Sequence, residues 1–292
     1  MPSYLIHDPI PALQAFGYTE REAAFLYIVA LHSGYFLRRQ FDWFIDRNKG
    51  SIVSRFLTKG RSAGHIEVLD YKQGWYVYHL CSRAIYRLCG EPESQLRRRK
   101  ADAQVRLRLM ALDYVLGNED DRYLASEADR LRYFVQVRGI PTDFLDDENR
   151  SLHRLLTAFP ISLTDRERPA RCAVRFVFID EGLSDAGKFV RFLDAAEPLF
   201  RAIGNFEVVY IANAESIFPS AKAAFWSRFA RTTPRSRGLF EEDVRSARHP
   251  SPSPLEPRFT TVLFRHSYPA IQRSRRQGSD RVRRAKEVGT SK

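Results

Sequence analysis

Two alternating apolar runs separated by a short corner constrain this chain more than any other feature. They occupy the stretch GHIEVLDYKQGWYVYHL, residues 64–80, on either side of Lys72, Gln73 and Gly74. Alternation with a period of two is typical of half-buried strands, and a short loop ending in Gly suits a turn residue with positive φ. The stretch therefore predicts an antiparallel hairpin with Lys72 and Gln73 at its tip.

Three amphipathic helices are predicted before the hairpin. The first starts after Thr19, because Thr19 and Glu22 have capping-box spacing ahead of an apolar run. Residues 35–47 have apolar positions at i, i+4, i+7 and i+8, and residues 49–64 follow with a third apolar stripe. Three helices and then a hairpin is the order of a winged helix-turn-helix domain. We expect such a domain over residues 12–92, with the hairpin as its wing.

Positive charge is concentrated in two parts of the chain, whose formal net charge is +12. Residues 35–100 hold 14 Lys and Arg against 6 Asp and Glu, and residues 232–292 hold the same numbers. Such clustering indicates a polyanionic partner, most simply nucleic acid. The alternative is an ordinary surface charge that serves solubility.

The second half of the chain changes character. Residues 82–90 predict a short helix, and residues 93–117 a long connecting helix whose apolar stripe also fits a dimer contact. Further on, residues 131–139, 172–180 and 206–213 are β-rich, and residues 151–160 read as a short helix.

The last two β-rich segments flank the helical run of residues 186–204, which is the spacing of a βαβ unit. It predicts a small α/β domain over residues 118–230. Residues 231–292 are rich in Pro, Ser and Arg and predict a disordered basic tail, with FTTVLF, residues 259–264, as an apolar island within it. The expected fold class is α+β: winged helix, long linking helix, α/β domain and tail.

Cysteine usage and hydropathy bear on the compartment. The three cysteines, Cys81, Cys89 and Cys172, leave one over after any pairing, and no apolar run reaches the length of a membrane span. The start of the chain has no signal-peptide pattern. We expect a cytoplasmic protein without a membrane partner.

The run from the second predicted strand into the next helix resembles a known family. Tyr78, Leu80, Ser82, Tyr86, Leu88 and Gly90 stand as in the amino-terminal domain of the replication-relaxation family and related regulators of plasmids and integrative elements. The resemblance covers roughly residues 18–116 and implies DNA binding in replication or transfer of a mobile element. The α/β half is similar to a nuclease-like unit that is often joined to such domains. Because the sequence has no invariant catalytic signature, the functional implication of the resemblance rests on architecture.

A metal-dependent DNA nuclease is the main enzymatic alternative. Asp180 and Glu181 follow one predicted strand and Glu207 begins another, so three carboxylates could converge on a metal. The acidic-x-Lys step of restriction nucleases occurs only at Asp70 and Lys72, inside the hairpin. We therefore expect an inactive, nuclease-like domain.

Two other motifs point to weaker alternatives. GLSDAGKF, residues 182–189, fits part of a phosphate-binding loop, but Phe189 stands where a hydroxyl must hold magnesium, so we expect no bound nucleotide. His79, Cys81 and Cys89 do not have the ligand spacing of structural zinc, so we expect packing residues and no cofactor.

The predicted DNA contacts lie on the third helix and the wing. Arg55 is the expected base contact, because Arg reads base edges in the major groove. The expected phosphate and wing contacts are Arg38, Arg39, Ser51, Ser54, Thr58, Lys59, Arg61, Lys72 and Gln73. The sequence thus predicts a non-enzymatic protein that binds double-stranded DNA, as a transcriptional regulator or as a replication or mobilisation factor, with a possible homodimer. A winged helix that binds protein instead is a third alternative.

Overall fold

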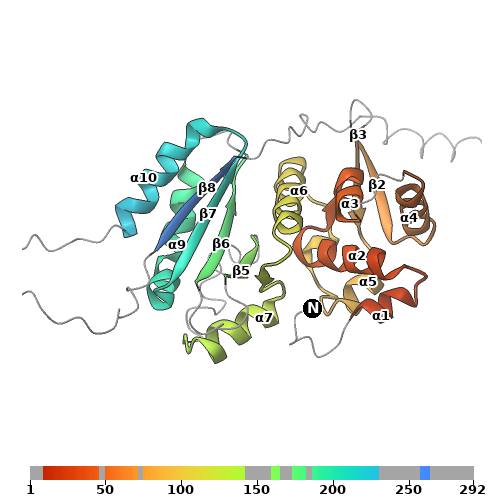
Figure 1. The fold of residues 1–292 in the computed structure, drawn as a ribbon, viewed down its shortest axis with the longest axis horizontal. Helices are drawn as coiled ribbons and strands as arrows, with labels where there is room; N and C mark the ends of the chain where they lie inside the picture. The colour runs from red at the N-terminus through yellow and green to blue at the C-terminus, as the bar shows by residue number, and fades with distance from the viewer. Residues whose placement is uncertain are drawn as a thin grey trace, which may run out of the picture. The chain divides into compact units, whose positions relative to one another are not determined.

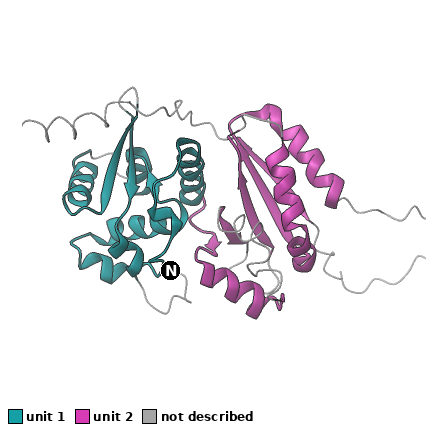
Figure 2. Cartoon of the chain, turned by 180° about the vertical axis from the view of Figure 1, so that it is seen from behind, with its two compact units in different colours: residues 1–117, 267–292 teal, residues 118–266 magenta. Residues whose placement is uncertain are grey.

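The computed structural model describes residues 9–45, 50–71, 75–141, 159–164, 173–181, 186–229 and 257–263. The described chain forms two compact units, which divide between Gly117 and Asn118 (Figure 2). Both contain helices and strands, so the expected α+β class is confirmed. None of the helices in these ranges combines the length and the apolar character that a membrane span requires.

The described part of unit 1 begins with four helices and a three-stranded sheet, which can be followed in Figure 1. The predicted first helix is confirmed, because the Thr19 and Glu22 side chains form the expected capping box at its start. The elements are α1 (Pro9–Gln14), α2 (Glu20–His32), β1 (Tyr35–Phe36), α3 (Arg38–Phe44), α4 (Gly50–Ser62), β2 (Ile66–Tyr71) and β3 (Trp75–Leu80).

The predicted hairpin is confirmed as the antiparallel pair β2–β3, with Glu67 opposite His79 and Tyr71 opposite Trp75. Its corner, residues 72–74, lies outside the described residues. Strand β1 pairs with β3, so the strand order in the sheet is β1-β3-β2. Helix α4 lies beside the outer strand β2 (Figure 1).

The core between the helices and this sheet is built from phenylalanines. Phe25, Phe36, Phe41 and Phe56 are fully buried, and the Phe41 and Phe56 rings stack with centroids 4.1 Å apart. Burying such a side chain stabilises the fold by about 1.5–3 kcal/mol. These rings come from α2, β1, α3 and α4, so they fix those four elements against one another.

The opposite face of the sheet is covered as well. Tyr35, Leu69 and Val77 pack there against Val105 and Leu109 of α6 (Asp102–Gly117). Between the sheet and α6 the chain contains α5 (Arg83–Leu88) and the short 3-10 turn η1 (Gln95–Arg97). The predicted short helix is thus confirmed as α5.

The prediction of one long connecting helix over residues 93–117 is wrong in its first half, because α6 begins at Asp102. The Lys100 backbone N–H donates to the Tyr35 hydroxyl at 2.8 Å, and the Tyr35 hydroxyl donates to the Arg98 carbonyl at 3.3 Å. These contacts hold the backbone of residues 98–100 against Tyr35 of β1, so this segment does not continue helix α6. Nor is α6 a free linker, because it packs on α2, α3 and β1 within unit 1.

Unit 2 contains a five-stranded sheet with the order β4-β5-β6-β7-β8. Strands β6, β7 and β8 are parallel to one another. Strand β5 pairs antiparallel with both β6 and β4. The elements are β4 (Arg122–Tyr123), α7 (Glu127–Leu131), the π-helical turn η2 (Arg132–Val137), β5 (Ile161–Leu163), β6 (Val174–Ile179), α9 (Gly187–Ile203), β7 (Phe206–Ala212), η5 (Glu215–Ile217), α10 (Phe218–Phe229) and β8 (Arg258–Leu263).

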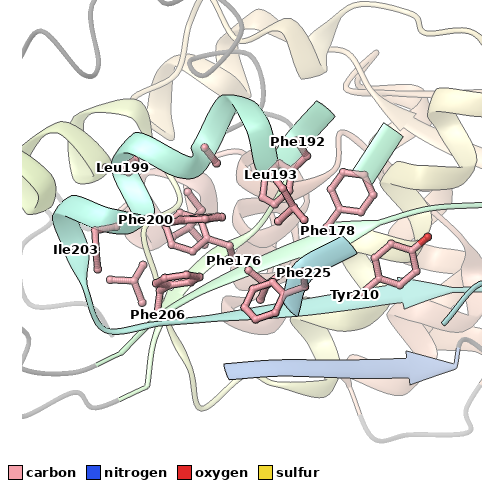
Figure 3. Packing of buried hydrophobic residues seen from close by; sticks show 14 of the residues in the cluster. Phe176, Phe178, Phe192, Leu193, Leu199, Phe200, Ile203, Phe206, Tyr210 and Phe225 are labelled. Carbon is pink, nitrogen blue, oxygen red and sulfur yellow. The ribbon is translucent and has the colours of Figure 1, made fainter. Parts of the chain in front are cut away.

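The predicted βαβ unit is confirmed by the parallel pair β6–β7 and the crossover helix α9. Aromatic side chains from strands and helices interleave on the face that α9 and α10 cover (Figure 3). Phe200 of α9 stacks on Phe206 of β7 at 4.4 Å, and Phe178 of β6 meets Phe192 of α9 at 5.0 Å. These contacts hold the α9 crossover onto the parallel strands.

Two expectations for this half of the chain are wrong, and a third falls largely outside the described residues. Residues 131–137 are helical in α7 and η2, so the β-rich reading is wrong there. Residues 258–263 form β8, so the tail is not disordered at these positions, and the apolar island docks as a strand. The helix predicted over residues 151–160 falls largely outside the described residues.

Candidate nucleic-acid interface

Helix α4 has one buried face and one exposed polar face. Val53, Phe56, Leu57 and Gly60 are buried, because they contact the phenylalanine core and strand β2. The exposed side chains on the other side are Ser51, Ser54, Arg55, Thr58 and Arg61. This set, named the α4 surface below, holds hydroxyl donors and two guanidinium groups and has no large apolar residue.

Arg55 lies in the middle of the α4 surface. It is exposed, and it makes no hydrogen bond or ion pair with any residue in the described ranges. A guanidinium group has five donors in a planar fork, which matches the acceptor pair of guanine or a phosphate. The geometry leaves this fork available to a partner.

Arg38 lies next to the start of the α4 surface. Its guanidinium donates to the Gly50 carbonyl at 3.1 Å, and its carboxylate neighbour Asp42 is 4.0 Å away on the same helix. Arg38 is still exposed. It therefore ties α3 to the first turn of α4 while its charge faces solvent.

Tyr78 of the hairpin packs in one core with Phe41 of α3 and Phe56 of α4, the helices that carry Arg38 and Arg61. Its ring stacks on Phe36, with 5.3 Å between centroids, and it is almost fully buried. Burial raises the pKa of Tyr78, whereas the nearby charges of Arg38 and Arg61 act in the opposite direction. The hairpin face next to α4 is thus part of the same positive region.

Lys59 is used inside the fold. Its ammonium group donates to Glu22 Oε2 at 2.6 Å and to the Gly17 carbonyl at 2.7 Å, and it lies 5.3 Å from the centre of the Tyr18 ring. Lys59 therefore anchors the end of α4 to the start of α2. It is not part of the α4 surface.

Arg39 is also used inside the fold. It donates two hydrogen bonds to the Asp113 carboxylate, at 2.9 and 2.7 Å, and Gln40 donates a third at 2.8 Å. Asp113 is buried within the apolar part of α6. The structure thus gives Arg39 a role in joining α3 to α6. A lone carboxylate inside the run LMALDYVLG was the sequence signal for such a partner.

The end of the hairpin holds two residues that the sequence analysis did not single out. Trp75 and Tyr76 are 39% and 51% exposed, although each is a large aromatic side chain. The signal was the pair of consecutive aromatic residues beside the corner, which breaks the alternation. Lys72 and Gln73, the predicted wing contacts, lie outside the described residues.

A buried histidine supports the end of α4. The Tyr18 hydroxyl lies 2.9 Å from His65 Nδ1, so the neutral ring can accept this hydrogen bond. Burial lowers the pKa of His65 and, together with the Glu22 charge, raises the pKa of Tyr18 to about 12. Both groups therefore stay neutral near pH 7 and act in packing.

The three carboxylates of the nuclease alternative do not converge. Asp180 and Glu181 follow the carboxyl end of β6, whereas Glu207 lies opposite Arg175 near the amino end of the parallel pair. Five residues of strand separate Arg175 from Asp180, about 16 Å at 3.3 Å per residue. The three carboxylates of the nuclease alternative therefore cannot share one metal ion.

Asp180 and Glu207 already have structural roles in unit 2. Asp180 is buried and accepts a hydrogen bond from the Tyr210 hydroxyl at 3.0 Å. Glu207 accepts from Arg175 and from Thr260, both at 2.8 Å, so it joins β6, β7 and β8. Among the described residues, no group of three His, Cys, Asp or Glu is arranged to hold a metal ion.

His79 and the described cysteines lie in packed surroundings. The His79 ring stacks on Tyr35, 4.4 Å between centroids, and burial lowers its pKa. Burial likewise raises the pKa of the Cys89 thiol to about 12, which leaves it unreactive near pH 7. In the loop-like motif, residues 182–185 lie outside the described ranges, and Phe189 is fully buried in the core of unit 2.

Comparison with protein-family models, with characterised proteins and with solved structures finds no match to this chain.

Proposed function

We propose that unit 1 is a winged helix-turn-helix domain that binds double-stranded DNA, with α4 as the recognition helix. The observation that carries the proposal is the α4 surface, in which an exposed arginine with no partner among the described residues is surrounded by hydroxyl groups. Arginine at the centre reads base edges, and shorter polar groups around it contact phosphates.

The order of the elements supports this proposal. A helix, a short strand, two further helices and a hairpin follow one another as α2, β1, α3, α4 and β2–β3, and the short strand pairs with the second strand of the hairpin. In this arrangement the hairpin flanks the recognition helix, so both can reach one duplex.

Charge supports it as well. The segment from residue 35 to residue 100 carries 14 basic against 6 acidic side chains. Of these, Arg38, Arg55 and Arg61 are exposed in or beside the α4 surface. Phosphate neutralisation by such groups releases counterions and supplies most of the affinity for DNA of any sequence.

The biological setting follows from the resemblance described for residues 18–116. We infer a non-enzymatic regulator, or a replication or mobilisation factor of a mobile element, whose unit 2 contacts a partner or a second copy. In unit 2 the carboxylates that would serve a nuclease lie at opposite ends of a strand pair.

The test is equilibrium binding of the full chain to a labelled duplex, followed by fluorescence anisotropy. With about six phosphate contacts, affinity should fall about 1000-fold between roughly 50 and 200 mM salt. Arg55→Ala should weaken binding by about tenfold, the loss expected for one arginine contact to a base.

The matched control is Arg87→Ala, because Arg87 is an exposed arginine of the same unit on α5, away from the α4 surface. It should bind within about twofold of the parent, since one surface charge contributes little at moderate salt. Equal affinities for the parent, Arg55→Ala and Arg61→Ala would contradict the proposal.

A further inference from the structure

The end of the hairpin next to its corner exposes two aromatic rings. Trp75 and Tyr76 are consecutive residues at the start of β3, and 39% and 51% of their surfaces are exposed. Scattered exposed apolar residues are common on protein surfaces, so what marks these two rings is their position together beside the hairpin corner. In the described part of unit 1, the other exposed aromatic residues are Phe16 and Trp43, and both have contacts on the body of the unit.

The two rings lie on opposite faces of the hairpin. Successive side chains of a strand alternate between its faces. Tyr76 therefore shares the face of Tyr78, which packs toward the helices, and Trp75 shares the face of Val77, which packs toward α6. This end of the hairpin thus has one aromatic ring on each side, and Tyr71, opposite Trp75, is buried on the Trp75 side.

Charge around the Tyr76 ring favours a nucleic acid over an apolar partner. Tyr78, on the same face as Tyr76, packs in one core with Phe41 of α3 and Phe56 of α4, so the helices that carry Arg38 and Arg61 cover this face of the sheet. Both arginines are exposed. An aromatic ring beside guanidinium groups offers stacking to a base and charge to its phosphate.

A continuous duplex has few base faces to offer such rings, because each base is covered by its neighbours in the stack. Unpaired bases at a fork, a bubble or a strand end have exposed faces. Stacking of one such base on an aromatic side chain raises the affinity by about 5- to 150-fold. The aromatic end of the hairpin therefore matches DNA in which paired and unpaired segments meet.

We propose that Trp75 and Tyr76 stack on unpaired bases, so that the preferred ligand is a junction of duplex and single-stranded DNA rather than a continuous duplex. The inference rests on the proposed function, because α4 would hold the duplex part. It defines the class of DNA that this domain selects.

The test compares three labelled DNAs at one salt concentration: a fork with unpaired tails, a blunt duplex of the same paired length, and one tail alone. The parent should bind the fork at least about tenfold more tightly than the blunt duplex, the gain expected for stacking of one base. Trp75→Leu and Tyr76→Leu keep an apolar side chain on the strand and remove the ring. Each should abolish most of the fork preference and leave blunt-duplex affinity within about twofold.

The control is Trp226→Leu, which alters an exposed tryptophan of unit 2 and should keep the fork preference. A second readout uses Trp43→Phe with Trp226→Phe, which leaves Trp75 as the one tryptophan of the chain. Its fluorescence should be quenched by the fork and much less by the blunt duplex.

The possible failures are distinguishable. Equal binding of the fork and the blunt duplex by the parent, or an intact fork preference in both leucine variants, overturns the inference and leaves duplex binding by α4 standing if Arg55→Ala is weakened. Equal losses on fork and blunt duplex in the leucine variants also overturn it, because they indicate contact with paired DNA. If the parent binds none of the three DNAs at low salt, both proposals fall.

Discussion

Arg39 of α3 and Asp113 of α6 form a two-pronged ion pair across 74 residues of chain, with N–O distances of 2.9 and 2.7 Å. The carboxylate is buried, and the guanidinium closes it off from solvent. Breaking a buried pair by removing one partner leaves an uncompensated charge.

Arg39→Ala should therefore destabilise unit 1 by about 3 kcal/mol. Arg39→Lys should lose less, because a lysine keeps the charge but not the paired hydrogen bonds. Urea denaturation measures both, with Arg87→Ala as the exposed-arginine control. An Arg39→Ala protein as stable as the parent would show that this pair does not hold α3 to α6.

Gly34 and Gly90 provide a matched test of backbone packing. Both have positive φ, 75° and 81°, but a Cβ on Gly34 would lie 2.5 Å from the Leu96 carbonyl oxygen, whereas Gly90 has nothing within 4 Å. Gly90→Ala should lose about 1–2 kcal/mol from the left-handed conformation alone. Gly34→Ala should lose clearly more, since the backbone at Leu96 must also move. Equal losses in thermal or urea denaturation would mean that the close approach is absent.

Acid should destabilise unit 1 through two buried histidines. Burial lowers the folded-state pKa values of His65 and His79 below the ordinary value of 6.5. The unfolded chain therefore binds protons first as the pH falls through 6.5, and the free energy of unfolding decreases from there until the folded pKa values are reached. The groups facing these rings are Tyr18, Tyr35, Glu67 and Arg99.

The measurement is urea denaturation at about pH 7.5 and about pH 5.5, above the range in which most carboxylates titrate. His65→Gln should show a smaller difference between the two conditions than the parent. A parent that is equally stable at both pH values would contradict the neutral, buried state of the histidines.

Strand β8 should contribute measurably to unit 2. Phe259 stacks on Phe225 with 5.0 Å between ring centroids and also meets Phe189, whereas Thr261 is exposed. Phe259→Ala should destabilise unit 2 by about 3 kcal/mol, near the lower end for loss of a packed phenylalanine. Thr261→Ala should stay within about 0.5 kcal/mol. Similar effects of the two substitutions would argue against a docked β8.

Local signals in the sequence predicted local structure well. The capping box of Thr19 and Glu22, the alternation around residues 72–74 and the βαβ spacing each depend on near neighbours, and each corresponds to an element of the structure. The polar face of α4 was equally readable, because helical periodicity alone separates Arg55 from Phe56 and Leu57.

Contacts between distant residues explain the errors. Residues 93–101 have a helical pattern, but the Tyr35 hydroxyl, 65 residues away from Lys100, binds their backbone outside a helix. The roles of Lys59 and Arg39 depend on Glu22 and Asp113, 37 and 74 residues away. No short window of sequence contains such pairs. Strand β8 was not predicted for the same reason, because it forms by pairing with the distant strand β7.

The place of β8 in the chain has a consequence for how the protein is made. The described residues of unit 1 end at Gly117, whereas the sheet of unit 2 is incomplete until Leu263 has been added. At about 5–20 residues per second, the ribosome needs roughly 7–30 s to travel that interval. Unit 1 can therefore fold on the nascent chain first. During that time the edge of β7 that later pairs with β8 remains unpaired and prone to association with other chains.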